Sequence, residues 1–109
     1  MTPRLVMLRR ARRDVDQIYD WIARKSRDGA ERWYLAFRAG CQRIVEAPES
    51  FSLAAEFDET GECAVREFSF KTRRGRTYRG LFILVEDEVR VLRVRGPGQP
   101  PLTRDEVDL

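Results

Sequence analysis

The sequence predicts an α+β fold in which one strand precedes a two-helix antiparallel hairpin and a three-stranded antiparallel meander. Two patterns carry this prediction. Apolar residues recur at helical spacing between residues 11 and 47, and three runs rich in β-forming residues lie between residues 64 and 95. A length of 109 residues with 42% hydrophobic residues fits one domain with one core. We therefore expect a single domain over residues 1–109.

The first 47 residues are expected to form the strand and the helical hairpin. Residues 1–10 contain an apolar run, Leu5 to Leu8, that is typical of a short strand. Residues 11–47 contain two amphipathic stripes joined by a short link, which favours antiparallel packing. The stripes are Ala11, Val15, Ile18 and Ile22, then Ala30, Tyr34, Phe37, Cys41 and Ile44. Asp28 and Glu31 resemble a capping box for the second helix, and Trp33, Tyr34 and Phe37 are expected in the core.

The second half is expected to form the meander over residues 64–95. Phe68 and Phe70 alternate with polar residues, and the run from Tyr78 to Val85 is apolar enough for a central strand. Gly75 is expected to supply the positive φ of a tight turn between these two strands. Residues 96–109 begin with GPGQPP and should form an irregular C-terminal tail, with a frayed helical turn or a mobile end.

Between the helices and the meander, residues 49–62 contain five acids and no Lys or Arg. We expect a surface loop with a turn at residues 58–61. This acidic loop could lie near the basic segment that follows it and partly neutralise its charge.

Composition excludes several kinds of chemistry. The chain has no histidine, which removes Ser/His/Asp and Cys/His nucleophile systems and the commonest metal ligand. Cys41 and Cys63 stand alone, without metal-ligand spacing, and are interpreted as reduced thiols, with Cys41 in the core. We expect no metal, no cofactor and no membrane span, and a cytoplasmic location.

A basic segment, AVREFSFKTRRGRTYR, holds the candidate binding residues. It carries six cations and one acid, whereas the whole chain has a net charge of +3. Those six are Arg66, Lys71, Arg73, Arg74, Arg76 and Arg79. They could bind an acidic partner, or they could be solvated strand and turn residues that discourage edge pairing. Arg79 lies in an apolar strand, so it should be functional or paired with Glu67 or an acid of residues 56–62.

Two further arginines could extend this basic surface. Arg93 and Arg95 alternate with Leu92 and Val94 in the last predicted strand. Both arginines are therefore expected to project from the face opposite those two apolar residues. They could share one binding surface with the basic segment, or form the solvated face of a half-buried sheet.

Taken together, the order and spacing of these pieces resemble the RelE/ParE superfamily of type II toxins. ARRDVDQIYDWIARKS and AERWYLAFRAGCQRIVEAPESF are similar to its helical hairpin, and REF with RTYRGLFILVEDEVRVLRVRG to its central strands. The resemblance is nearer to the ParE branch, whose members act by binding DNA gyrase. The resemblance therefore implies a cytoplasmic toxin that inhibits growth, stabilises a plasmid or genome, and is neutralised by a cognate antitoxin. Operator DNA would be bound only through the antitoxin complex.

The resemblance also leaves two alternatives. Members that resemble RelE cut mRNA on the ribosome without a metal, and this would assign catalysis to Lys71, Arg73, Tyr78 and Arg79, with Lys71 as the proton acceptor. No Tyr or His follows Arg95, however, so a complete nuclease set is not visible. The further alternative is a non-toxic binding module with this fold.

Overall fold

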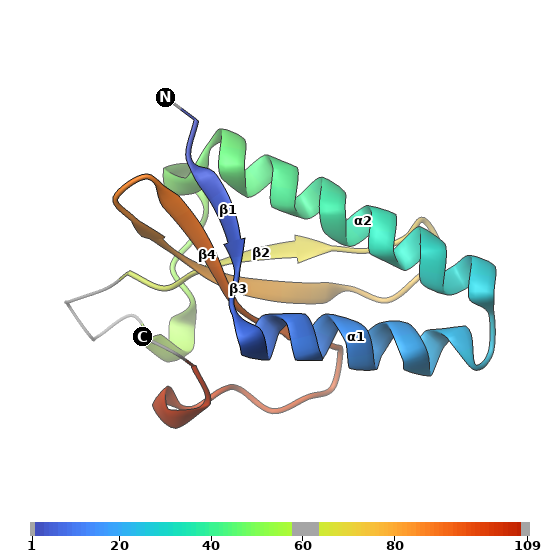
Figure 1. Cartoon of the computed structure of the whole chain (residues 1–109). Coiled ribbons are helices and arrows are strands. Elements are labelled where there is room, and N and C mark those ends of the chain that lie inside the picture. Colours follow the sequence, from blue (N-terminus) through green and yellow to red (C-terminus); the bar gives the residue numbers. More distant parts are fainter. Residues whose placement is uncertain (1, 58–63, 108–109) are drawn as a thin grey trace.

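The computed structural model describes residues 2–57 and 64–107, and its elements follow the predicted order (Figure 1). The predicted α+β class is confirmed. The predicted turn at residues 58–61 and Cys63 lie outside the described residues. The strands are β1 (Arg4–Met7), β2 (Arg66–Phe70), β3 (Tyr78–Val85) and β4 (Glu88–Arg95), and the helices are α1 (Arg9–Ala23) and α2 (Arg27–Glu46). Short 3-10 turns are η1 (Pro48–Ser50), η2 (Ala55–Phe57) and η3 (Arg104–Glu106).

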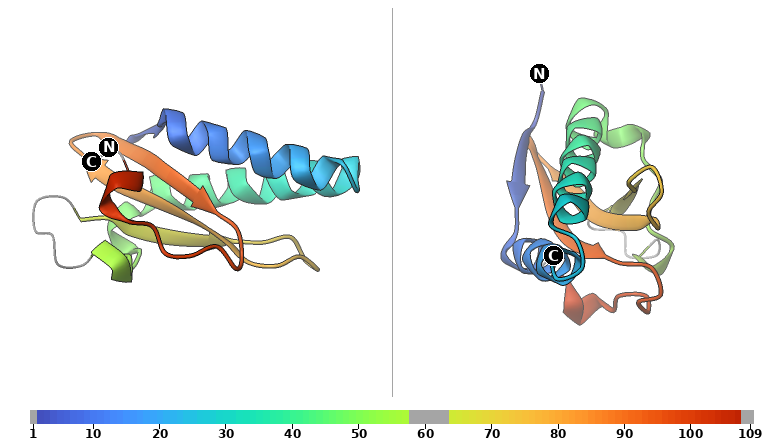
Figure 2. Two further views of the ribbon diagram at one scale, coloured as in Figure 1. Left: turned by 90° about the horizontal axis from the view of Figure 1, so that it is seen from below. Right: turned by 90° about the vertical axis from the view of Figure 1, so that its right-hand side faces the viewer.

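The four strands form one mixed sheet in the order β1-β4-β3-β2. The predicted antiparallel meander is present as β2, β3 and β4, and β1 adds to β4 in parallel, with Met7 opposite Val91. Both helices lie on one face of the sheet, α1 along β4 and α2 over β2. Figure 2 shows the C-terminal segment on the opposite side of the sheet from the helices.

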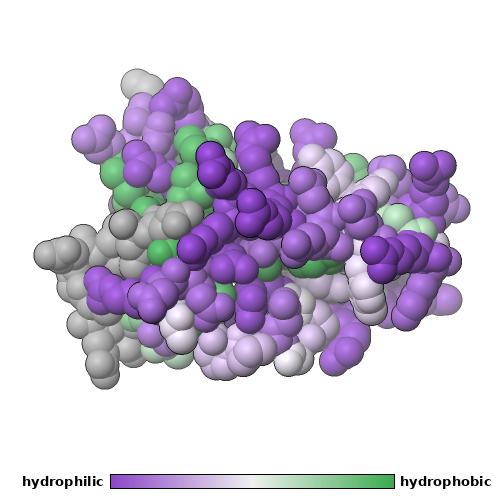
Figure 3. All heavy atoms as spheres, turned by 60° about the horizontal axis from the view of Figure 1, so that its bottom comes forward, coloured by the Kyte–Doolittle hydropathy of each residue, from purple (hydrophilic) through white to green (hydrophobic). Residues whose placement is uncertain are grey.

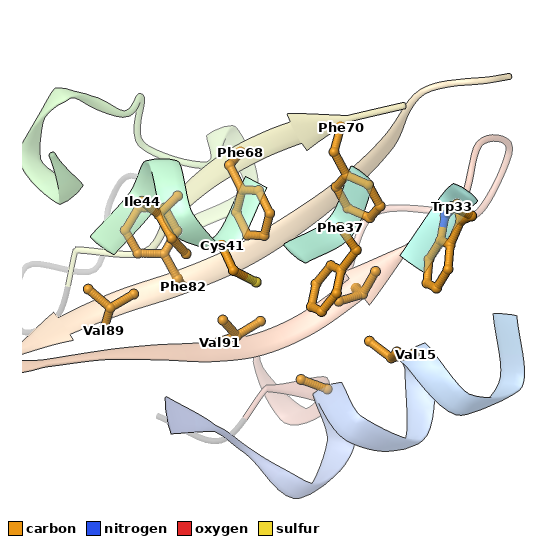
Figure 4. Close-up of a cluster of buried hydrophobic side chains, with 12 residues drawn as sticks. Val15, Trp33, Phe37, Cys41, Ile44, Phe68, Phe70, Phe82, Val89 and Val91 are labelled. Atoms are coloured by element: carbon orange, nitrogen blue, oxygen red, sulfur yellow. The ribbon is translucent and has the colours of Figure 1, made fainter. Parts of the chain in front are cut away.

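The main core lies between the helices and the sheet (Figure 4). Its centre is a series of aromatic rings from α2, β2 and β3, in which Trp33 stacks on Phe37 and packs against Phe70. Trp33, Phe37 and Cys41 are buried, as expected, but Tyr34 is 37% exposed. Tyr34 packs edge-on against Tyr19 of α1, and this contact between the helices leaves its ring partly open to solvent.

A second apolar cluster covers the other face of the sheet. Leu81, Ile83 and Leu92 project from β3 and β4 and meet residues of the connection before β2 and of the C-terminal segment. From that segment Leu102 is 3% exposed and Val107 is 6% exposed, and η3 between them is closed by a Thr103–Glu106 capping box. The tail is thus irregular, as expected, and holds the predicted helical turn. Its end packs on the sheet, and the expectation of a frayed or mobile end is wrong for residues 102–107.

Two local predictions are wrong for physical reasons. The cap of α2 is Ser26 rather than Asp28, because extended Ser26 accepts the Gly29 N–H at 2.9 Å and leaves Asp28 in the first turn. Gly75 lacks the positive φ expected of it, since residues 71–77 form a longer connection. The tight hairpin is instead Glu86–Asp87 between β3 and β4, where Glu86 has φ 56°.

Close approach of α2 to the sheet depends on the ring of Phe68. A Cβ added at Gly80 of β3 would lie 2.3 Å from one edge of that ring. At Gly40 of α2, an added Cβ would lie 2.9 Å from the other edge. The ring therefore fills the space between two glycines, and neither position has room for a side chain.

We predict that Gly80→Ala lowers the free energy of unfolding by about 1–3 kcal/mol, because the added methyl group overpacks the space beside Phe68. Equilibrium urea unfolding measures the change. In a Phe68→Leu background the ring edge is absent, so the same alanine should cost less. Equal losses in the two backgrounds would contradict this account.

A second prediction concerns Cys41, whose thiol is buried among the core rings. Burial raises the pKa of the Cys41 thiol to about 12, against a smaller lowering effect of Arg38. The reactive thiolate is therefore scarce at neutral pH. In a Cys63→Ser variant, maleimide labelling should be slow for the folded protein and fast in urea. Rapid stoichiometric labelling of the folded variant would refute the buried placement.

Candidate functional site

The structure divides the predicted binding residues into two groups. The strand cations lie in the sheet, and the loop cations lie in the connection between β2 and β3, residues 71–77. The strand cations are Arg66, Arg79, Arg93 and Arg95, and the loop cations are Lys71, Arg73, Arg74 and Arg76. The two groups differ in what their charges contact.

Arg79 is held between two carboxylates. It lies in β3 opposite Ser69 of β2 and Arg95 of β4. Its guanidinium forms an ion pair with Glu56 of η2 and a longer one, at 3.4 Å, with Glu67 of β2. These partners are among the acids expected for a paired Arg79, and the side chain is 31% exposed. The carboxylates offset the charge of Arg79, so it contributes less to any external binding surface.

Arg93 forms the best-defined ion pair of the strand cations. Its Nε and Nη2 lie 2.7 and 3.0 Å from the two oxygens of Asp14 in α1, a bidentate contact. Its Nη1 donates to the Glu106 carbonyl at 2.8 Å, and Asp14 also accepts the Val94 N–H at 2.9 Å. The side chains of Arg93 and Asp14 are only 15% and 11% exposed. Arg93 therefore joins α1, β4 and the C-terminal segment from inside the fold.

A β-bulge explains why the predicted facing of β4 is wrong for Leu92. The pairing register between β3 and β4 shifts between Leu81 and Phe82. Leu81 pairs with Arg93 and Phe82 with Val91, so β4 carries one extra residue, Leu92. As a result Leu92 and Val94 lie in different apolar clusters, on opposite faces of the sheet. Arg93 and Arg95 follow the bulge and pair regularly with Leu81 and Arg79, so they share the face opposite Val94, which is also the face of Leu92.

The remaining strand cations also contact the chain itself. Arg66 donates to the Phe51 carbonyl at 2.6 Å, and Arg95 donates to the Pro100 carbonyl at 2.9 Å. The Arg95 Nε is buried and has no hydrogen-bond partner among the described residues. Arg79 and Arg95 line a small pocket of about 290 Å³ beside Ser69, Tyr78 and the turn that follows β4.

Tyr78, a candidate in the nuclease alternative, is an aromatic packing residue. Its ring stacks on Phe70 with centroids 5.9 Å apart and meets Trp33 at 5.5 Å. Burial raises the pKa of the Tyr78 phenol, against a smaller lowering effect of Arg76. The phenol therefore stays protonated at neutral pH and is a poor proton acceptor there.

The loop cations, in contrast, are exposed and have no hydrogen bond or ion pair within residues 2–57 and 64–107. They lie at the end of the molecule where α1 turns into α2 (Figure 1). That link adds the exposed cations Arg24, Lys25 and Arg27. We call these two segments, residues 24–27 and 71–77, the basic end. Its charges can attract an acidic surface, but they form no ordered set of acid, base and nucleophile.

The described residues hold no group of three or more His, Cys, Asp or Glu that could bind a metal ion. No described helix combines the length and the apolar character needed to cross a membrane. Sequence reasoning did not single out Asp14 as a partner of Arg93, because the two are 79 residues apart and no local pattern links them.

Comparison with known families adds one finding. The sequence model for the ParE toxin of the parDE type II toxin–antitoxin system matches residues 5–99. That range contains both helices, the basic end and all of the sheet except Arg4, and it stops before η3. None of the curated proteins matches the chain.

The two groups of cations should respond differently to mutation. We predict that Asp14→Ala lowers the free energy of unfolding by about 3–5 kcal/mol, because it breaks a largely buried bidentate ion pair and leaves the Val94 N–H without its acceptor. Arg73→Ala in the loop should change it by less than about 0.5 kcal/mol. Urea unfolding of both variants measures the contrast. Similar small changes in both would show that Asp14 does not anchor β4.

Proposed function

We propose that this chain, which belongs to the ParE toxin family of type II toxin–antitoxin systems, arrests growth by binding DNA gyrase and is neutralised by a cognate antitoxin. The family match over residues 5–99 is the observation that carries the proposal. In this mechanism the toxin stabilises a gyrase–DNA intermediate by binding alone, so it needs no catalytic residues of its own.

The contacts of the candidate residues favour binding over catalysis. A ribosome-dependent nuclease would need exposed cations that hold a phosphate in the transition state, together with a proton acceptor. Arg79 is instead engaged by Glu56 and Glu67, and the raised pKa of Tyr78 keeps its phenol protonated. The exposed members of the candidate set lie in residues 71–77, where they are suited to an acidic surface of a large partner.

One observation is compatible with the nuclease alternative. Arg79 and Arg95 line the same small pocket, and the Arg95 Nε has no partner among the described residues. A phosphate group in that pocket would lie beside two guanidinium groups, although the Arg95 Nε is buried. The nuclease would then have to release Arg79 from its two carboxylates before the arginine could hold the transition state.

Gyrase supercoiling with purified protein tests the proposal. We predict inhibition of supercoiling, with no effect on relaxation by topoisomerase I as the enzyme control. An Arg73→Glu/Arg74→Glu variant should inhibit about tenfold less, because charge reversal in the exposed loop repels an acidic partner. A matched Arg32→Glu/Arg38→Glu variant, which reverses two exposed charges on α2, should retain inhibition if the loop makes the contact.

Three results would contradict the gyrase proposal. Growth arrest with new 5′ ends on translated mRNA and unchanged supercoiling would assign the nuclease activity. Induced expression without growth arrest would identify a non-toxic binding module. Growth arrest that persists when the product of the adjoining reading frame is co-expressed would remove the antitoxin assignment.

A further inference from the structure

An apolar groove opens at the basic end of the molecule. It has a volume of about 600 Å³ and lies between α1, the start of α2, residues 72–78 and the turn after β4. Its apolar walls are Ile18, Trp21, Ile22, Trp33 and Tyr78. The ribbon views place the α1–α2 link and the β2–β3 connection at the same end (Figure 2). These are the segments that form the rim of the groove.

Two tryptophans in this groove lack the contacts that a finished core would give them. Trp21 is 55% exposed, although it is the largest kind of apolar side chain. Trp33 is 2% exposed, yet its indole N–H has no hydrogen-bond partner among the described residues. That nitrogen is itself buried, so Trp33 belongs to the packed wall of the groove, and Trp21 offers the exposed apolar surface to an occupant.

The charge around the groove selects an acidic occupant. All seven cations of the basic end are exposed, and neither of its two segments contains an acid. Arg76 belongs to the groove wall itself. The view of α1 and the C-terminal segment in Figure 3 shows a mainly hydrophilic surface with small, separate apolar patches. An apolar groove enclosed by positive charge therefore favours a segment that combines acidic residues with an apolar anchor.

We propose that this groove docks an acidic segment of the antitoxin that inserts a large apolar side chain between Trp21 and Trp33. The inference rests on the proposed function, because it takes the antitoxin as the partner. The anchor contacts Ile18, Ile22 and the exposed ring of Trp21. Acidic side chains of the segment lie against Arg76 and the other cations of the basic end.

A protein segment fits these walls better than a single-stranded nucleic acid. The ammonium group of Lys25 lies 4.8 Å from the centroid of the Trp21 ring and occupies one of its faces. Base stacking needs open aromatic faces, whereas the other walls include the aliphatic side chains of Ile18 and Ile22. Aliphatic walls complement a Leu or Phe side chain.

Fluorescence anisotropy with a labelled synthetic peptide tests the docking. The probe carries Leu at helical spacing and Glu elsewhere, and it should bind saturably with a blue shift in tryptophan emission. Both tryptophans of the chain line the groove, so that emission reports on this site. Probes of the same length with Ser in place of Leu, or Lys in place of Glu, should not bind.

Variants of the full-length protein locate the bound peptide. Trp21→Ala should weaken binding about tenfold by loss of the anchor contact. Arg76→Glu changes an exposed side chain, so the variant should keep the fold. It should weaken peptide binding to a similar extent. Leu35→Ala removes a 63% exposed apolar side chain of α2 outside the groove and should leave binding unchanged.

Several outcomes would overturn the docking. These are absence of peptide binding, equal binding by all variants, displacement of the peptide by oligo(dT), and failure of the purified antitoxin to displace it. Each is distinguishable from failure of the proposed function. Gyrase inhibition without binding in the groove would remove only the docking, and binding in the groove without gyrase inhibition would remove only the target.

Discussion

The carboxylate of Asp14 is the contact on which the arrangement of this protein depends most. Strand β1 ends at Met7, opposite Val91, so β4 extends beyond the end of its parallel neighbour. Over that extension Asp14 takes the place of the missing strand by accepting the Val94 N–H and holding Arg93. An open strand edge would otherwise invite pairing with another chain. One side chain of α1 thus covers the edge and anchors the helical hairpin to the sheet.

Close packing of the second helix completes the position of the hairpin. With the Phe68 ring between Gly40 and Gly80, α2 lies close above β2 and β3. Asp14 holds α1 against β4 at the same time. These two attachments place the α1–α2 link beside the β2–β3 connection, and the groove forms between them. The candidate docking site is therefore a consequence of how the hairpin is attached to the sheet.

The arginines of this chain fall into two sets that differ in whether a carboxylate offsets their charge. Arginines of β3 and β4 are used within the fold, where Glu56, Glu67 and Asp14 offset their charge. Cations in the connections have no such partners among the described residues and remain exposed. Among the candidate binding residues, the exposed cations thus lie at one end of the molecule, a distribution that favours binding of an acidic surface over phosphoryl chemistry in the sheet.

By itself the sequence determined the class of fold and the order of the elements, because helical and strand periodicities are local properties of the chain. It also indicated the pairing of Arg79, since a charged side chain in an apolar strand requires a partner. Tertiary structure alone decided the rest. The bulge at Leu92, the contact between Asp14 and Arg93, the packing of Leu102 and Val107, and the groove around Trp21 and Trp33 all join distant segments. Their geometry follows from how helices and sheet pack together, which no local pattern records.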